Sequence, residues 1–234
     1  MANIRKIMRT CKFILMVLIG KELNMRVRIP MNKLRLGSTY GGWNICPNYL
    51  SADSIVYSFG IGEDISFDLE LIKHFGCNIY AFDPTTKSLD WLKTQSLPKK
   101  FNYYGYGIAD FDGLAQFFPP DNPEHVSHTI LYKESIQNKT IEVEVHKLTT
   151  IMDNFGHSFI NLLKMDIEGA EYSVLEDLIK SDVKVRQLLI EFHHRFPQVG
   201  LQKTKKIIKQ LNNYGYELFA ISDSKEEYSF IKVN

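Results

Sequence analysis

Apolar runs of strand character alternate with segments of helical periodicity from Ser54 to the end of the chain. Each run is rich in β-branched and aromatic residues and ends near a glycine, a proline or a charged residue, which is typical of a buried strand. The segments between them repeat apolar residues every three or four positions, as amphipathic helices do. The expected strands cover residues 54–62, 78–83, 101–110, 159–167 and 185–194, and the expected helices cover 65–76, 85–96, 170–181 and 201–215.

This alternation predicts a mostly parallel sheet, because strands that are joined through a helix run in the same direction. The last two expected strands, residues 216–224 and 227–233, are joined by a polar turn around Ser224 and Lys225. That turn is too short for a crossover, so the last strand must be antiparallel to its predecessor. We therefore expect an α/β fold with helices on both faces of the sheet and one antiparallel strand near its end.

The stretch from about residue 111 to 146 departs from the alternation. Three prolines in its first half indicate a loop, whereas residues 140–148 alternate apolar and charged side chains. Such alternation is typical of a strand with one face in solvent. We expect an excursion of antiparallel strands and loops from the main sheet, within one domain that spans residues 51–234.

The charge and the cysteine content indicate which kinds of binding partner and which cellular environment to expect. The chain has 28 Lys and Arg against 27 Asp and Glu, and its formal net charge of +1 lacks the basic excess of nucleic-acid-binding domains. Cys11, Cys46 and Cys77 are scattered and odd in number, which argues against a disulfide framework. A reducing, cytoplasmic setting and a small-molecule or glycan partner are therefore expected, and no nucleic acid.

The first 50 residues differ from the rest of the chain. Four Lys and Arg within the first 12 residues precede an apolar run at residues 13–19, which is far shorter than the roughly 20 residues that a membrane-spanning helix needs. We expect residues 1–50 to form a helical or irregular segment that packs on the domain. A contact of this segment with a membrane surface, to which the protein would then be peripheral, or with a second copy of the chain stays open.

Carboxylates gather at the expected carboxyl ends of the strands, where open α/β sheets bind their ligands. In the turn of residues 59–64, Gly60 and Gly62 let a ligand approach the main chain closely. Glu63 and Asp64 stand where the pyrophosphate of a dinucleotide would meet the helix N-terminus, and two negative charges would repel it. The turn therefore favours a neutral or cationic ligand over NAD.

Two further acids suit a nucleoside. Asp83, at the end of the second strand, is placed to bind the two hydroxyls of a ribose, although it could also be a turn residue before Pro84. Asp110 follows the third strand and could accept a hydrogen bond from an adenine amino group. Together with the glycine turn they indicate an adenosine-bearing cofactor without a pyrophosphate.

Four stretches resemble the FkbM family of S-adenosylmethionine-dependent methyltransferases. They are VYSFGIGEDISFD, YAFDPT, LLKMDIEGAEYSVLEDL and LLIEFHHRF, and the string from Lys164 to Glu171 is the most specific part. The similarity runs from about Leu36 to Val233, and YGGW at Tyr40–Trp43 is similar to a segment of some members. The resemblance implies a class I methyltransferase (Rossmann-like) fold, a seven-stranded sheet whose last strand is antiparallel, and S-adenosylmethionine as the cofactor.

The resemblance also implies which residues bind the cofactor. Those expected to line its methionine part are Phe59, Gly60 and Ile61, with Asp83 at the ribose and Ile108 and Asp110 beside the adenine. Where many members have Asp, Asn and Gly around the first turn, this chain has Ser58, Gly62 and Asp64. Contacts to the amino group of the cofactor are therefore expected from Asp64 or Asp166, and Gly62 is expected to line the cofactor.

Methyl transfer to a hydroxyl needs a group that removes the proton. His193 follows the fifth strand, where alternation places it on the same face as Glu191 and opposite His194. We expect His193 to be the base, with Glu191 as its orienter or as an acceptor of the substrate hydroxyl, and Asp166 beside them. Two alternatives stay open: Glu191 and His193 are structural, or Asp166, Glu191 and His193 ligate a divalent metal that orients a sugar diol.

Three carboxylates share the turn after the fourth strand. We expect Asp166 to be functional and Glu168 to be a candidate that faces the substrate. Glu171 lies in the first turn of the next helix, where its charge complements the helix dipole, and we expect no other role for it.

The predicted function is S-adenosylmethionine-dependent O-methylation of a hydroxyl on a sugar, a glycan or a natural-product-like small molecule. N-methylation stays open within the same class. A nucleotide-binding, sugar-modifying oxidoreductase is opposed by Glu63 and Asp64, and a non-catalytic interaction protein that retains the fold is the third alternative. The acceptor pocket is expected from residues 111–146 and the N-terminal segment.

Overall fold

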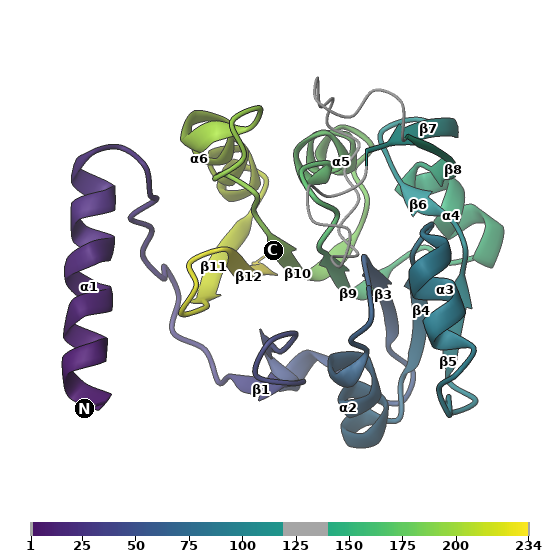
Figure 1. Cartoon of the computed structure of the whole chain (residues 1–234). Helices are drawn as coiled ribbons and strands as arrows, with labels where there is room; N and C mark the ends of the chain where they lie inside the picture. Colours follow the sequence, from purple (N-terminus) through teal and green to yellow (C-terminus); the bar gives the residue numbers. More distant parts are fainter. Residues whose placement is uncertain (1, 119–139, 234) are drawn as a thin grey trace.

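The computed structural model describes residues 2–118 and 140–233, and it places the side chains of all of these except residues 2–7, 9 and 10. A seven-stranded sheet forms the centre of the chain, in the order β11-β12-β10-β9-β3-β4-β5 (Figure 1). Its strands are β3 (Ile55–Phe59), β4 (Asn78–Phe82), β5 (Phe101–Tyr104), β9 (Ile160–Met165), β10 (Val185–Glu191), β11 (Tyr216–Ile221) and β12 (Glu227–Lys232).

The direction of the strands confirms the predicted sheet. The strands β5, β4, β3, β9 and β10 are parallel to one another. In contrast, β12 lies between β10 and β11 and is antiparallel to both. The polar turn between the last two strands is the physical reason, since it is too short to return the chain to the starting edge.

Helices cover both faces of this sheet. Those on one face are α4 (Leu148–Phe155), α5 (Glu171–Lys180) and α6 (Gly200–Asn213), and those on the other are α2 (Ser66–Phe75) and α3 (Thr86–Leu92). Alternation along β3 serves both layers, because Tyr57 packs in the core with Leu175 of α5 whereas Val56 packs in the core with Leu71 of α2. Burial on both faces explains the near-continuous apolar runs in the sequence.

Residues 22–49 lie against the domain. The hairpin of β1 (Leu34–Leu36) and β2 (Trp43–Ile45) packs on the α2 side, and the 3-10 helix η1 (Pro47–Tyr49) follows. The side-chain amide of Gln187 in β10 bonds the main-chain N–H and the carbonyl of Cys46, at 2.8 and 3.0 Å. A predicted domain boundary near residue 50 thus falls within a segment that is tied to the central sheet, and it stays a prediction.

Helix α1 (Ala2–Leu18) stands apart from the sheet (Figure 1). Ile14, Leu15 and Leu18 are exposed there, and a contact with the domain is that of Phe13 with the ammonium of Lys225. Within the described residues, no helix has the length and apolar character needed to cross a bilayer.

A second sheet lies beside the first. It consists of β6 (Gly107–Ile108), β8 (Ile141–His146) and β7 (Gly113–Phe117), in that order, and β8 is antiparallel to β7 and parallel to β6. Val143 and Val145 are buried while Glu142 and Glu144 are exposed, as the alternation predicts. The three prolines predicted to form a loop lie outside the described residues.

One expectation about the elements is wrong, and one helix was missed. Residues 101–110 form two strands, β5 and β6, because the chain turns at Gly105 and Tyr106 and β6 then pairs with β8 instead of β4. Helix α4 was not predicted. It is short, and no side chain caps its N-terminus, so the sequence carries no clear start signal. Its residues Leu148, Ile151 and Met152 are buried against the sheet.

Candidate active site

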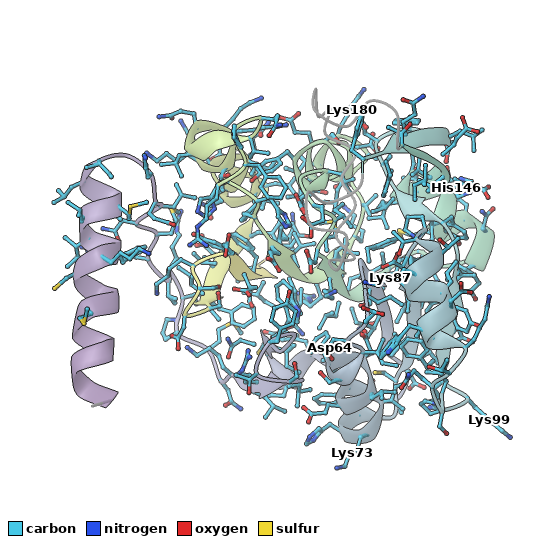
Figure 2. All side chains as sticks on the ribbon, in the orientation of Figure 1. Asp64, Lys73, Lys87, Lys99, His146 and Lys180 are labelled. Carbon is cyan, nitrogen blue, oxygen red and sulfur yellow. The ribbon has the colours of Figure 1, made fainter. Side chains whose placement is uncertain are left out.

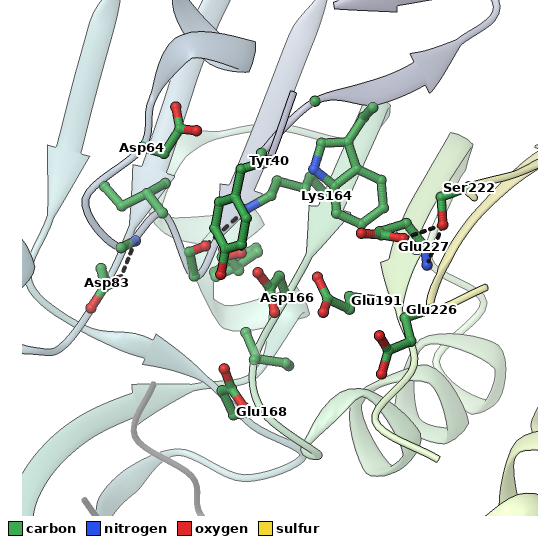
Figure 3. A pocket seen from close by; sticks show the side chains of 18 of the residues that line it. Tyr40, Asp64, Asp83, Lys164, Asp166, Glu168, Glu191, Ser222, Glu226 and Glu227 are labelled. Atoms are coloured by element: carbon green, nitrogen blue, oxygen red, sulfur yellow. Dashed lines mark hydrogen bonds between the residues drawn. The ribbon is translucent and has the colours of Figure 1, made fainter. Parts of the chain in front are cut away.

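The carboxyl ends of β3, β4, β9 and β10 open into a cavity of about 1080 Å³ (Figure 3). It is also lined by the β1–β2 loop and by the turn between β11 and β12. A volume of this order accommodates a nucleoside-sized cofactor together with an acceptor. The position agrees with the rule that open sheets of this kind bind ligands beyond the carboxyl ends of their strands.

Gly60 follows β3 with φ +70° and lines this cavity. A Cβ atom on Gly60 would overlap the main-chain oxygen of Asp166, at the end of the neighbouring strand β9. The sequence suggested that the glycine lets a ligand approach. The structure gives a different reason, which is the close approach of two strand ends in a left-handed conformation that favours glycine.

Asp83 is a turn residue, which is one of the two roles that the sequence left open, and it also lines the cavity. The carboxylate is buried, and its Oδ1 accepts hydrogen bonds from the N–H and the hydroxyl of Thr85 at 2.9 and 2.6 Å. Its Oδ2 accepts the N–H of Gly62 at 3.0 Å, and Asp83 lines the cavity (Figure 3). Since a carboxylate oxygen has two lone pairs, Oδ2 can accept one more hydrogen bond, for example from a ribose hydroxyl.

An apolar wall lies next to Asp83. Ile108 is buried and lines the cavity with Pro84 and Phe117, a surface suited to the face of a purine. Asp110 is exposed and lies outside the set of described residues that line the cavity. The structure therefore does not bring Asp110 to the site, because the chain leaves the main sheet after β5.

Asp64 lies at the edge of the cavity near β1 and α2 (Figure 2). Its oxygens accept the hydroxyl of Ser38 at 2.6 Å and the N–H of Ser66 at 2.9 Å. Although burial acts to raise it, these hydrogen bonds hold the pKa of Asp64 below its usual range. The carboxylate thus anchors the β1–β2 loop, which leaves it fewer lone pairs for a cofactor amino group than the sequence suggested.

The anchored loop presents Tyr40 at the mouth of the cavity (Figure 3). The guanidinium of Arg35 bonds the carbonyl oxygens of Ser38, Thr39 and Gly42. Tyr40 itself is 91% exposed, whereas Trp43 is buried as packing. The loop is therefore held firmly while one aromatic side chain stays available to a ligand.

Lys164 was not predicted as a site residue. Its buried ammonium donates to the main-chain oxygen of Gly60 at 2.8 Å and lies on β9, two residues before Asp166. Its place in the string from Lys164 to Glu171 was the signal in the sequence. The lysine stabilises the glycine turn and adds a positive charge next to the carboxylates.

His193 lies among four carboxylates, those of Asp166, Glu168, Glu171 and Glu191. Its Nδ1 is 2.9 Å from Oε1 of Glu171, which is completely buried. The Glu171 carboxylate also accepts the main-chain N–H groups of Ile167 and Gly169 at 3.0 Å each. The structure thus corrects two predictions: the orienter of His193 is Glu171 rather than Glu191, and Glu171 is more than the start of a helix.

The opposite nitrogen, Nε2 of His193, faces three carboxylates. The distances from Nε2 to oxygens of Glu168, Asp166 and Glu191 are 3.4, 3.7 and 3.9 Å. Glu168 holds φ +53°, a conformation that is costly for a residue other than glycine and is often found at functional sites. The structure therefore brings together the predicted residues Asp166, Glu191 and His193, and adds Glu168.

His194 lies on the other face, as the alternation predicts. Its Nε2 is 3.2 Å from Glu22, which Arg195 also contacts at 2.6 Å. This pair ties the N-terminal segment to the end of β10 and is separate from the cavity.

The crowding of carboxylates alters the protonation of the cluster. Burial raises the pKa of Asp166 to about 6, against the effect of Lys164, and burial together with Asp166 raises the pKa of Glu191 to about 9. Burial acts to lower the pKa of His193, but the charge of Glu171 and its hydrogen bond raise it well above the usual range. These three groups therefore favour their protonated forms.

Two more acids line the cavity, one in the turn between β11 and β12 and one at the start of β12, and the sequence did not single them out. Glu226 pairs with Arg195 at 2.5 Å, and Glu227 accepts the hydroxyls of Ser222 and Ser224. Only the polar composition of this turn hinted at them.

Comparison with known sequences identifies the class of protein as a methyltransferase. Residues 35–218 match the methyltransferase FkbM domain, which covers more than half of the chain. The chain belongs to this family.

Curated relatives carry the name "Probable methyltransferase-like protein 24". The human protein is 27% identical over 83% of this chain and 52% of its own length, and the rat protein is 27% identical over 76% and 46%. The chain thus spans about half the length of the curated relatives it matches.

Solved structures show distant similarity to the chain. Fibrillarin of Aeropyrum pernix, in a complex with bound S-adenosylmethionine, is 11% identical with a TM-score of 0.41, over 78% of this chain and 66% of that one. Fibrillarin of Methanococcus jannaschii is 9% identical with a TM-score of 0.46, over 90% and 98%.

Proposed function

We propose that the chain transfers a methyl group from S-adenosylmethionine to a hydroxyl of a sugar, a glycan or a natural-product-like small molecule. Membership of a methyltransferase family supports the class of reaction. One observation supports the choice of cofactor and acceptor. The cavity has the buried Asp83 and an apolar wall at one end, and the acidic cluster around His193 at the other.

The residues present fit the cofactor. Asp83 has a lone pair free for the ribose hydroxyls, Ile108 and Pro84 offer an apolar surface for the adenine, and the turn after Phe59 is open to the methionine part. When bound, the cofactor supplies the methyl group on a sulfonium. The acidic lining favours that positive charge, and Asp166 offers a carboxylate for the amino group.

The charge of the cavity supports a hydroxyl acceptor. Carboxylates accept hydrogen bonds from hydroxyl groups, and five that line the cavity near β10 are Asp166, Glu168, Glu191, Glu226 and Glu227. Binding of nucleic-acid phosphates relies instead on Lys and Arg. The same lining therefore opposes a phosphate-rich acceptor.

The hydroxyl must lose its proton as the methyl group arrives, and the acidic cluster is placed to assist. Glu171 holds the ring of His193 so that Nε2 is directed toward Asp166, Glu168 and Glu191. Two routes fit this arrangement. Either Nε2 of His193, in the neutral form of its imidazole, accepts the proton directly, or a cation among these groups makes the hydroxyl more acidic.

A transfer assay tests the proposal. The chain is incubated with isotopically labelled S-adenosylmethionine and separate panels of polyols, glycans, amines and RNA, and the products are identified by mass spectrometry. We expect a methyl ether on a polyol or glycan together with demethylated cofactor. Transfer only to an amine or to RNA would overturn the hydroxyl assignment.

The N-terminal segment and the cellular setting are proposals as well. We propose a cytoplasmic protein in which the exposed residues Ile14, Leu15 and Leu18 of α1, next to basic positions, contact an anionic membrane surface or a second copy of the chain. Flotation with anionic vesicles and sedimentation without them separate these two contacts.

A further inference from the structure

Three potential metal ligands from two strand ends meet at the wall of the cavity: Asp166 and Glu191 line it, and the buried His193 lies next to them. An oxygen of Asp166, an oxygen of Glu191 and a nitrogen of His193 all lie within 4.8 Å of one another. Bonds from divalent cations to such donors are about 2.0–2.6 Å long, so one ion fits between them after side-chain shifts of a few tenths of an ångström. We propose that Asp166, Glu191 and His193 bind a divalent cation.

The histidine provides the second, independent observation. It is 6% exposed, and within residues 2–118 and 140–233 its Nε2 forms no hydrogen bond, although it points at the carboxylates. Its Nδ1 is paired with Glu171, which is 0% exposed and is fixed by the N–H groups of Ile167 and Gly169. In the neutral ring, a carboxylate that takes the N–H of one nitrogen leaves the lone pair on the other, which is how metal-bound histidines are commonly oriented.

The negative charges around Nε2 of His193 also favour a bound cation. Three carboxylates, from Asp166, Glu168 and Glu191, surround one imidazole nitrogen, and the nearby ammonium of Lys164 is bonded to Gly60. A proton on the imidazole adds only one positive charge, whereas a divalent ion adds two and gives each ligand a bond. Carboxylate with imidazole is a donor set that suits Mn²⁺ and related ions.

This step rests on the proposed function. A cation at this place narrows the acceptor to a substrate with two adjacent hydroxyls. Two hydroxyl oxygens bound to the ion are oriented toward the cofactor, and the ion lowers the pKa of the reacting hydroxyl. The hydroxyl proton goes to the carboxylate of Glu168. The alkoxide oxygen then forms a bond to the methyl carbon as the C–S bond breaks. The electron pair of the C–S bond stays on the sulfur, which becomes a neutral thioether.

The test measures metal binding without cofactor or substrate. The full chain is stripped with a chelator, desalted and titrated with Mn²⁺, and free Mn²⁺ is followed by electron paramagnetic resonance. We expect one Mn²⁺ per chain, and electron spin-echo modulation from a coordinated imidazole nitrogen. Binding of no Mn²⁺ below millimolar concentration, or bound Mn²⁺ without the nitrogen signal, would overturn the inference.

Matched variants locate the site. We expect Asp166→Asn and Glu191→Gln each to weaken Mn²⁺ binding at least ~10-fold, and Glu171→Gln to weaken it ~10–100-fold, as removal of such supporting partners does. Glu63→Gln, a carboxylate of the same cavity that pairs with Lys87, should leave it unchanged. Equal losses in all four variants would mean adventitious binding. Circular dichroism checks that each variant is folded, and the wild-type titration stays decisive if one is not.

The outcome is separable from that of the proposed function. If Mn²⁺ binds but S-adenosylmethionine does not, the metal site stands and the proposed cofactor is wrong. If the cofactor binds and methyl transfer is unaffected by the chelator, the metal inference fails alone and His193 returns to the role of base.

Discussion

Glu171 shows how one buried side chain organises the site. It accepts the N–H groups that precede α5 and the Nδ1–H of His193, so the same carboxylate completes the helix start and orients the ring. In a sequence, an acid in the first turn of a helix is explained by the dipole alone. Its burial depends on the neighbouring strand β10, which the local sequence does not reveal.

Substitution of His193 tests its participation in the reaction. In His193→Ala we expect methyl transfer to fall by ~10² or more, because the hydroxyl loses the group that activates it, with cofactor affinity unchanged by calorimetry. His74→Ala, on the exposed face of α2, is the control and should retain activity. Wild-type turnover in His193→Ala would exclude His193 from either route.

Substitution of Asp83 tests the cofactor end. We expect Asp83→Ala to weaken binding of S-adenosylmethionine by roughly 1–3 kcal/mol, the scale of a lost partner for a polar group. Asp110→Ala removes a carboxylate that the structure places outside the cavity and should not change the affinity. Calorimetry of both variants measures the difference, and equal affinities would remove Asp83 from the cofactor site.

Helices and strands with a clear pattern of apolar residues were predicted, whereas elements that depend on contacts between distant parts of the chain were not. The runs that form β3, β4, β9 and β10 are buried on both faces and could be recognised from their composition. The split between β5 and β6 could not, since β6 pairs with β8, which lies more than 30 residues further along the chain. The site residues were predicted from the strand ends. The structure brings Asp166, Glu191 and His193 together as predicted, and it does not bring Asp110 to the cavity.

The turn from β3 to α2 depends on Gly60. Gly60→Ala must adopt a left-handed conformation and also separate two strand ends, because its Cβ would meet the oxygen of Asp166. We expect a loss of at least ~3 kcal/mol in the free energy of unfolding.

Gly156→Ala is the matched control for Gly60. Its φ of +69° is nearly the same as the +70° of Gly60, but no atom lies within 4 Å of its Cβ, so only the conformational cost of about 1–2 kcal/mol applies. Urea unfolding of both variants measures the two costs. Equal losses would show that the contact with Asp166 is unimportant.

Helix α2 carries a buried acid, Asp68, that predicts a dependence of stability on pH. Burial raises its pKa to about 6 in the folded chain, above the ordinary value of about 3.9. The folded state therefore holds the proton more tightly than the unfolded state does. Ionisation of Asp68 costs stability as the pH rises from about 4 to about 6, up to about 3 kcal/mol in total.

Asp68→Asn removes this dependence. We expect the variant to gain in unfolding free energy relative to the wild type as the pH is raised from 4 to 7.5, since only the wild type loses stability through this group. Urea unfolding at both pH values provides the comparison. A difference between variant and wild type that is independent of pH would contradict the assignment to Asp68.

At the scale of the whole molecule, the two ends of the cavity come from different parts of the chain. Asp83 lies at the end of β4, and the acidic cluster is formed by the ends of β9 and β10 together with the turn before α5. The N-terminal loop with Tyr40 and the turn between β11 and β12 complete the lining. The parallel sheet is the element that holds these parts in register, so cofactor and acceptor are expected to bind side by side.

Calorimetric titration of the purified chain with S-adenosylmethionine, its demethylated product and NADPH tests the central claim most directly. The account predicts that one molecule of S-adenosylmethionine or of the demethylated product binds per chain and that NADPH does not, because Glu63 and Asp64 oppose a pyrophosphate. Binding of NADPH together with no binding of either sulfur compound would contradict it.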